Sequence, residues 1–360
     1  MKKYNLIVKT AEAEIRALEN VPQEHISNIF PIIEITRGRK ITRDNRALYP
    51  FDKRLSKFKN IFKDQMVCID VTSDPSLSSA ETLALFDSKD GYSNWVKFLL
   101  QLKEENVFSQ IIPTVLWNFN DSNFEENIKL QISSLIASFG QIAYRNPIEE
   151  EGVYEDMELF LQNVPLIFIL DCGYVPGASC NNVAQKGISR LNNLKRMPNL
   201  KISNLIVAAT SFPNNVTEFG DLETDTLKLS EVELNKLISA DCDELDIEYG
   251  DYGSINPIRN DTITMTRGWV PRIDVSNETS VFYHRIHRPK GTTAYSDTYI
   301  QVAKACVDDP AFPHNDIDTW GIRQIRSCAQ GSVPSSVPSF WISVRMNTHI
   351  KRRLQALKLI

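Results

Sequence analysis

Four acidic residues at or near the ends of separate apolar stretches have the chemistry of a hydrolytic site: Glu34, Asp70, Asp171 and Glu248. If the fold gathers them, their oxygens would suit Mg²⁺ or Mn²⁺, which prefer hard oxygen ligands. Such an ion promotes hydrolysis of phosphorylated substrates by polarising oxygens and orienting water. These four are the candidate catalytic and metal-binding residues. Two alternatives stay open: a pair of them acts as acid and base in glycoside cleavage, or all of them form structural salt bridges.

A second group of residues has the chemistry of a ligand-binding surface. The basic stretch Arg-Gly-Arg-Lys at 37–40 and the stretch Tyr-His-Arg-Ile-His-Arg at 283–288 combine cations with an aromatic ring. Arginines hold phosphates, and aromatic rings stack on bases. Solvated loop charges are the plainer interpretation. The candidate ligand-binding residues are Lys9, Arg37, Arg145, Tyr249, Asp251, Tyr252, Trp269, Arg272, Tyr283 and Arg285.

Eight short apolar stretches, most of them followed by helical patterns, must position these side chains. Alternation of strands and helices is typical of a parallel α/β fold, and eight near-continuous apolar strands favour a closed (β/α)₈ TIM-like barrel over an open sheet. The stretches are 4–9, 29–35, 66–70, 110–116, 141–144, 164–171, 204–210 and 244–248. In such a barrel the carboxyl ends of all strands share one rim, where barrel enzymes place their chemistry.

The segment Tyr-Gly-Asp-Tyr-Gly at 249–253 follows the last of these strands. Two glycines around an acidic and an aromatic residue widen the conformations open to the backbone at an entropic cost, which is typical of a turn that forms part of a functional site. We expect Tyr249, Asp251 and Tyr252 to point toward the barrel mouth.

The remainder of the chain changes character. Segments 267–274 and 280–288 alternate like two antiparallel strands, and helical patterns follow. The predicted organisation is a barrel over 1–260, a β-hairpin over its rim at 261–290, and a C-terminal helical appendage of the same domain at 291–360. On the last helix His349 shares a face with Arg345, and we expect it to act as an anchor.

Composition narrows the class of protein. The 360 residues carry a net charge of -5, which argues against nucleic acid as the bulk target. Six dispersed cysteines without a Cys-x-x-Cys pair favour a reduced, cytoplasmic protein. No apolar run is long enough for a membrane span, and no Gly-x-x-x-x-Gly-Lys-Ser/Thr loop supports ATP hydrolysis of the P-loop type.

Short motifs are spread over nearly the whole chain: Tyr4, Lys9, Glu14, Ala17-Leu18, Pro31-Ile-Ile-Glu-Ile35, the 249–253 segment, Trp269-Val-Pro-Arg272, Tyr283-His-Arg285, Trp341, Arg345 and His349-Ile350. Together they resemble the motifs of the phage-encoded "beta family" proteins. In the first helix the family more often shows Lys-x-Gly-Glu, where this chain has Lys-Thr-Ala-Glu at 9–12. The resemblance supplies no catalytic residues.

What the resemblance implies is an association with phage, prophage and defence loci, where the namesake is similar to an antitoxin-like partner of a killer protein. We therefore expect a component of an antiphage defence or toxin–antitoxin-like system. It would be a regulatory or sensor barrel that acts through a protein partner, such as a toxin, an effector or a phage protein. The alternative is a metal-dependent hydrolase, like a phosphodiesterase or nuclease, acting on a nucleotide or phosphorylated substrate at the rim.

Overall fold

The computed structural model describes residues 3–360 except 45, 151–156, 215–221, 259–267 and 292–293. Its centre is a sheet of eight strands in which all neighbouring strands run parallel. In chain order they are β1 (Tyr4–Lys9), β2 (Ile29–Ile35), β5 (Met66–Val71), β6 (Gln110–Pro113), β7 (Ile142–Pro147), β8 (Pro165–Tyr174), β9 (Lys201–Thr210) and β11 (Ile247–Asp251).

The sheet closes into a barrel. Strand β11 pairs with β1. A parallel bridge between Thr114 and Ala143 joins β6 to β7. The predicted (β/α)₈ TIM-like fold is confirmed, and each of the eight predicted stretches contains or overlaps a strand of the barrel.

Period-two alternation divides the strand residues between two buried layers. One set, including Ile7, Ile32 and Ile169, forms a core inside the barrel. The other set, including Leu6 and Phe168, packs outward into the larger core shared with the helices. Both faces of most strand residues are buried, which explains why the strands are mainly apolar, with their polar residues at few positions.

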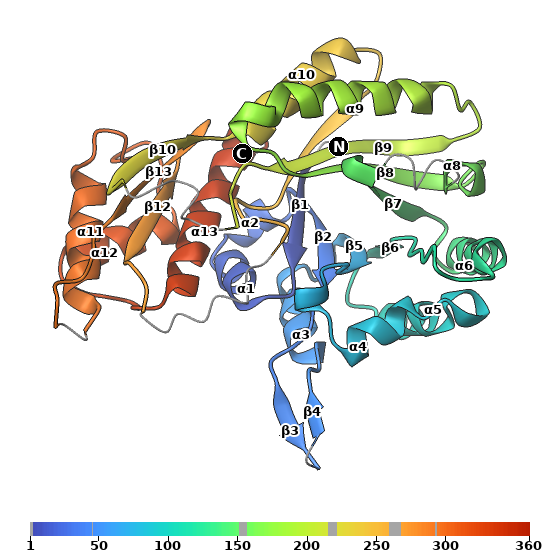
Figure 1. The fold of residues 1–360 in the computed structure, drawn as a ribbon, viewed down its shortest axis with the longest axis horizontal. Helices are drawn as coiled ribbons and strands as arrows, with labels where there is room; N and C mark the ends of the chain where they lie inside the picture. Colours follow the sequence, from blue (N-terminus) through green and yellow to red (C-terminus); the bar gives the residue numbers. More distant parts are fainter. Residues whose placement is uncertain (1–2, 45, 151–156, 215–221, 259–267, 292–293) are drawn as a thin grey trace.

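Helices follow the strands and cover the barrel wall (Figure 1). They are α1 (Glu12–Glu19), the short α2 (Gln23–Ile26), α3 (Asp52–Ile61), the short α4 (Ala80–Leu83), α5 (Lys89–Glu104), α6 (Phe124–Phe139), α8 (Met157–Phe160), α9 (Cys180–Lys195) and α10 (Ser230–Asp241). After β11, the position beside α1 is filled by the last helix, α13 (Pro338–Ala356), whose Asn347 Nδ2 donates to the Ala17 carbonyl at 3.0 Å.

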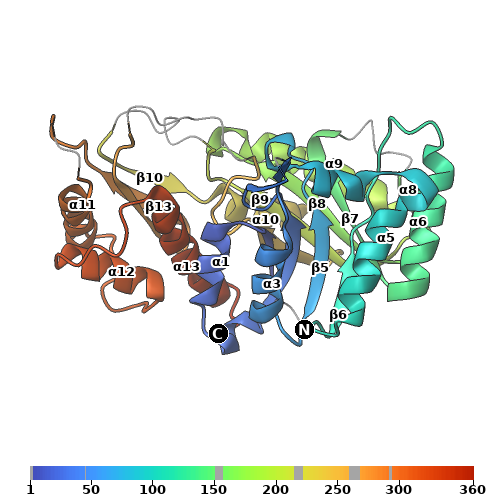
Figure 2. The same cartoon turned by 90° about the horizontal axis from the view of Figure 1, so that it is seen from below.

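A second unit with its own apolar core is formed mainly by the chain between β11 and α13, together with one strand that precedes α10. Strands β12 (Arg272–Ser276) and β13 (Ser280–Arg285) form the predicted hairpin, and β10 (Thr224–Lys228) adds a third antiparallel strand. Helices α11 (Ser296–Asp308) and α12 (Trp320–Ala329) cover this sheet. The sequence places the hairpin over the rim. In the structure the small sheet lies beside the barrel, with α13 between them (Figures 1 and 2).

Helix α13 joins the two units because it contributes to both cores. Phe340 and Val344 pack in the core of the small sheet, whereas Met346 and Ile350 pack in the core around the barrel. No helix among the described residues is long and apolar enough to cross a membrane.

One further element leaves the body of the molecule. Strands β3 (Ile41–Arg43) and β4 (Arg46–Leu48) pair as an antiparallel hairpin between β2 and α3. Figure 1 shows this hairpin projecting away from the barrel beyond α3.

Candidate functional site

Six polar side chains meet at the mouth of the barrel, at the carboxyl ends of its strands. Five of them belong to the inward-facing sets of their strands, and Tyr252 follows the end of β11. Alternation and register bring the strand residues to one level, since Lys9 pairs with Glu34 and Glu34 pairs with Asp70. We call this group the mouth cluster: Lys9, Glu34, Asp70, Arg145, Asp171 and Tyr252.

Arg145 lies at the centre of the mouth cluster. Its Nη1 donates to Glu34 Oε2 and to Asp70 Oδ2, both at 2.8 Å, and its Nε donates to Asp171 Oδ2 at 2.8 Å. Its Nη2 donates to the Tyr252 hydroxyl at 2.9 Å. Burial disfavours the charge of Arg145, but the groups around it raise its pKa well above the ordinary value. One guanidinium therefore holds three carboxylates.

The oxygens of these carboxylates have further partners. Lys9 Nζ lies 3.1 Å from Glu34 Oε1. Thr114 Oγ1 donates to Asp70 Oδ1 at 2.7 Å. Tyr252 donates to Asp171 at 2.6 Å. Multiple partners of this kind are what buried carboxylates need to remain charged.

Glu34 and Asp70 lie on neighbouring strands and respond to this environment in opposite directions. Burial opposes the charge of Glu34, but Lys9 and Arg145 lower its pKa to about 2. For Asp70, burial raises the pKa, and the nearby charge of Glu34 adds to that effect. Two carboxyl groups with separated pKa values are the arrangement that divides acid and base roles in enzymes.

The position predicted for Mg²⁺ or Mn²⁺ is occupied differently in the structure. Glu34, Asp70 and Asp171 do gather at the rim, but the cation between them is the guanidinium of Arg145. An ion coordinated by all three would have to displace Arg145. As it stands, the arrangement gathers two cations, three carboxylates and a phenol at one rim.

Glu248 lies elsewhere, and the prediction that it belongs to this group is wrong. Strand β11 begins at Ile247 rather than at 244, and its register pairs Gly250 with Asn5 near the start of β1. Glu248 therefore lies near the amino end of the barrel, where it accepts hydrogen bonds from Asn5 Nδ2 at 3.0 Å and from Asn204 Nδ2 at 2.8 Å.

Of the three residues expected to point to the mouth from the 249–253 segment, only Tyr252 does so. Tyr249 and Asp251 belong to the opposite face of β11 and lie in the layer between the barrel wall and the helices. Tyr249 packs in the outer core, and the Asp251 side chain bonds to α13. Strand alternation separates these residues from Tyr252.

The remaining candidate ligand-binding residues lie away from the mouth cluster. Arg37 is at the base of the projecting hairpin, with its guanidinium 5.6 Å from the Tyr49 ring centroid. Trp269 stacks on Tyr295, with ring centroids 4.1 Å apart.

Three more of these candidates belong to the small sheet. Arg272 pairs with Asp274 at 2.6 Å and lies over the Tyr283 ring at 3.7 Å. Arg285 donates from Nε to the Leu222 carbonyl at 2.8 Å. These contacts are internal to the small unit, so the structure does not combine these residues with the mouth cluster.

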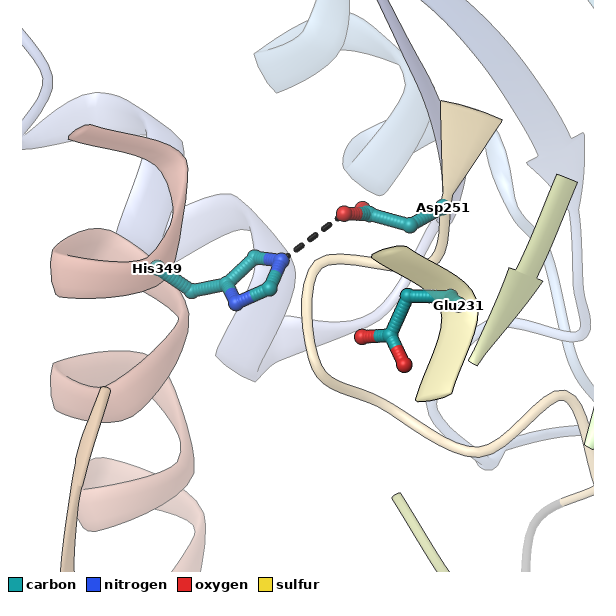
Figure 3. Close-up of side chains that lie close together, drawn as sticks. All are labelled: Glu231, Asp251 and His349. Carbon is teal, nitrogen blue, oxygen red and sulfur yellow. Dashed lines mark hydrogen bonds and ion pairs between the residues drawn. The ribbon is translucent and has the colours of Figure 1, made fainter. Parts of the chain in front are cut away.

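A second buried cluster lies where α10, β11 and α13 meet, and Figure 3 shows its three side chains (Glu231, Asp251 and His349). His349 Nε2 lies 2.8 Å from Asp251 Oδ2, and His349 Nδ1 lies 3.2 Å from Ser276 Oγ. Glu231 Oε2 accepts from the Ser211 amide at 2.9 Å, while its Oε1 is buried without a hydrogen-bond partner.

These three residues have the donor types of a metal site, and their ligand atoms lie within 4.8 Å of one another. Asp251 is nevertheless saturated, since it also accepts from Tyr249 at 2.7 Å, from the Gly253 amide at 2.7 Å and from Tyr4. Burial opposes its charge, but His349 and these donors lower the pKa of Asp251. We interpret the cluster as a polar link that fastens α13 to the barrel, which is the anchoring role expected of His349.

The fold and the mouth cluster define a (β/α)₈-barrel protein with a buried charged group at its carboxyl rim. The Beta protein family matches residues 4–355, and the chain belongs to this family. No curated protein and no solved structure matches the chain.

Proposed function

We propose that this protein is a regulatory or sensor barrel of an antiphage defence or toxin–antitoxin-like system, which binds a charged ligand at its mouth and acts through a protein partner. Support for the ligand site comes from the mouth cluster, in which Arg145 holds three carboxylates and a tyrosine at the rim where barrels place their sites. Support for the partner comes from what the family resemblance implies.

The mouth cluster has the properties of a ligand-responsive group. An anionic ligand would compete with Glu34, Asp70 and Asp171 for Arg145 and Lys9. Because the cluster ties five strands and the turn after β11 to one another, such an exchange would alter contacts across the barrel. A change of this kind could alter the affinity for a partner, since a ligand shifts an equilibrium by its differential affinity for two states.

The experiment compares two tyrosine variants. Tyr252→Phe removes the hydroxyl that bonds Arg145 and Asp171, whereas Tyr283→Phe removes a hydroxyl of the small sheet that bonds the Leu222 carbonyl. Each protein is screened by thermal shift against nucleotides and phosphorylated metabolites, and used as bait in cells under phage challenge. We expect Tyr252→Phe to lose both the ligand response and the phage-dependent partner that Tyr283→Phe retains. Equal behaviour of the two variants would reject the proposal.

A hydrolase of a nucleotide or phosphorylated substrate is the second candidate, and the opposite pKa shifts of Glu34 and Asp70 favour it. In that case Asp70→Asn abolishes turnover of the substrate while binding persists. Turnover that requires Mg²⁺ or Mn²⁺ would support the metal-dependent form. Turnover that is unchanged by a chelator would support acid–base chemistry by the carboxyl groups alone.

A further inference from the structure

The projecting hairpin β3–β4 is held firmly at its base and has few contacts beyond it. The Gly38 amide donates to the Tyr49 carbonyl at 3.0 Å, and this hydrogen bond joins the two ends of the hairpin. A Cβ atom at Gly38 would lie 1.6 Å from the Pro50 carbonyl oxygen, so this close approach requires glycine. Beyond the base, the hairpin strands extend away from the body (Figure 1).

The hairpin concentrates positive charge in a chain whose net charge is -5. Residues 38–48 contain four cations and one acid, a net charge of +3. All four cations are exposed, and within the described part of the chain no ion pair joins any of them to an acid. They are Arg39, Lys40, Arg43 and Arg46.

The placement of two of these cations opposes the stability of the hairpin itself. Arg43 and Arg46 are directly paired across the ladder. Like charges in that position are destabilising, and an isolated two-stranded hairpin is only marginally stable. An anion bound between the two arginines would remove this repulsion.

We infer that the hairpin β3–β4 is an arm that binds duplex DNA, an activity that goes beyond the proposed function of the barrel. A two-stranded ribbon fits the major groove of B-form DNA, and arginine matches phosphate and guanine in bidentate geometry. Protein–protein interfaces are instead built around an apolar and aromatic centre. On strands β3 and β4 only Ile41 is a large exposed apolar side chain, at 45%.

The distance of the hairpin from the barrel explains how an acidic protein can bind an anionic polymer. A three-residue strand extends ~10 Å, about one Debye length at physiological salt. Beyond that distance the negative charge of the barrel is largely screened. The hairpin therefore presents a local positive charge to DNA. The net negative charge of the whole chain has little effect at that distance.

The test measures binding of the full-length protein to a fluorescent 20-base-pair DNA duplex by anisotropy, at salt concentrations from 50 to 200 mM. Four phosphate contacts predict a log–log salt slope of about -3.6, which is a loss of affinity of roughly 150-fold over that range. The double variant Arg43→Gln/Arg46→Gln removes two contacts. Its slope should fall to about -1.8, which is a loss of roughly 12-fold.

The matched control is Lys236→Gln/Lys304→Gln, which makes the same change in net charge at exposed positions on α10 and α11. We expect this control to bind like the unmodified protein. Absence of binding at 50 mM salt, or equal slopes for the two double variants, would overturn the inference.

Two further probes test the identity of the ligand. A-form RNA of the same sequence has a deep, narrow major groove that side chains cannot read. Weaker binding to RNA therefore supports the groove-binding arm, and equal affinity for RNA overturns it. Polyglutamate of matched charge tests for an acidic protein partner. Weaker binding to polyglutamate supports DNA, and binding as tight as that of the duplex overturns the assignment to nucleic acid.

Discussion

Replacement of Arg145 by methionine tests whether the mouth cluster is held together by this one guanidinium. The substitution keeps most of the side-chain volume and leaves Glu34, Asp70 and Asp171 buried with fewer cationic partners. Removing one member of a buried ion pair costs about 3–5 kcal/mol, because it leaves an uncompensated charge. The pKa of Glu34 gives a comparable figure, since a change from 4.5 to about 2 corresponds to about 3 kcal/mol.

The expected loss of unfolding free energy in Arg145→Met depends on pH. The folded-state pKa of Glu34 lies below its ordinary value, so its contribution to stability is present above pH 4.5 and is lost as the pH falls toward 2. Without Arg145, burial would raise the pKa values of these carboxyl groups, and they would take up protons at higher pH. The difference in unfolding free energy between the variant and the unmodified protein should therefore be about 3–5 kcal/mol at pH 7 and smaller at pH 4.

The assay is urea unfolding at both pH values, with Arg323→Met as control. Arg323 forms an exposed pair with Asp318 at 2.7 Å, and such surface pairs contribute about 0–1 kcal/mol. If Arg145→Met costs no more than Arg323→Met, or if its cost is the same at pH 4 and pH 7, the account of the mouth cluster is refuted.

Three more predictions concern the second buried cluster and the hairpin base. Asp251→Asn should lower the unfolding free energy by about 3 kcal/mol in urea titrations, because an amide oxygen cannot accept from all four donors that now bond the carboxylate. Burial raises the pKa of Glu231, so the protein loses stability as the pH rises from the ordinary value of 4.5 toward that raised pKa. Glu231→Gln should therefore gain stability relative to the unmodified protein as the pH rises from 4 upward, and a constant difference in melting temperature would contradict this. Gly38→Ala should open the base of the hairpin, which limited proteolysis would detect as new cleavage within 38–49, while the melting temperature of the barrel changes little.

The barrel could be predicted from the sequence because the same pattern, an apolar strand followed by a helix, recurs along the chain. Most strands are mainly apolar, as strands buried on both faces tend to be, and each of the first seven ends close to where its apolar pattern ends. Glu34, Asp70 and Asp171 could be placed at one rim for the same reason. Their positions at strand ends are a local property of the chain.

The bounds of the eighth strand were predicted less accurately. The acidic segment at 241–248 has no sharp apolar boundary, and a start three residues too early brought Glu248 to the wrong end of the barrel. The opposite orientations of Asp251 and Tyr252 could have been read from alternation alone. The contact between His349 and Asp251 could not, because it spans 98 residues and requires the small sheet to fold between them.

Helix α13 has a consequence for the timing of biogenesis. The ribosome makes a chain from its amino end, and domains tend to fold as their segments emerge. Here β1 and α1 precede the other described strands and helices, yet the helix that covers them, α13, is translated after all of these elements. A nascent chain that has completed all eight strands still exposes the apolar surface that α13 will cover. The covering of β1 and α1 therefore waits until α13 has emerged, and a chain truncated before Pro338 would leave this apolar surface open to chaperones and proteases.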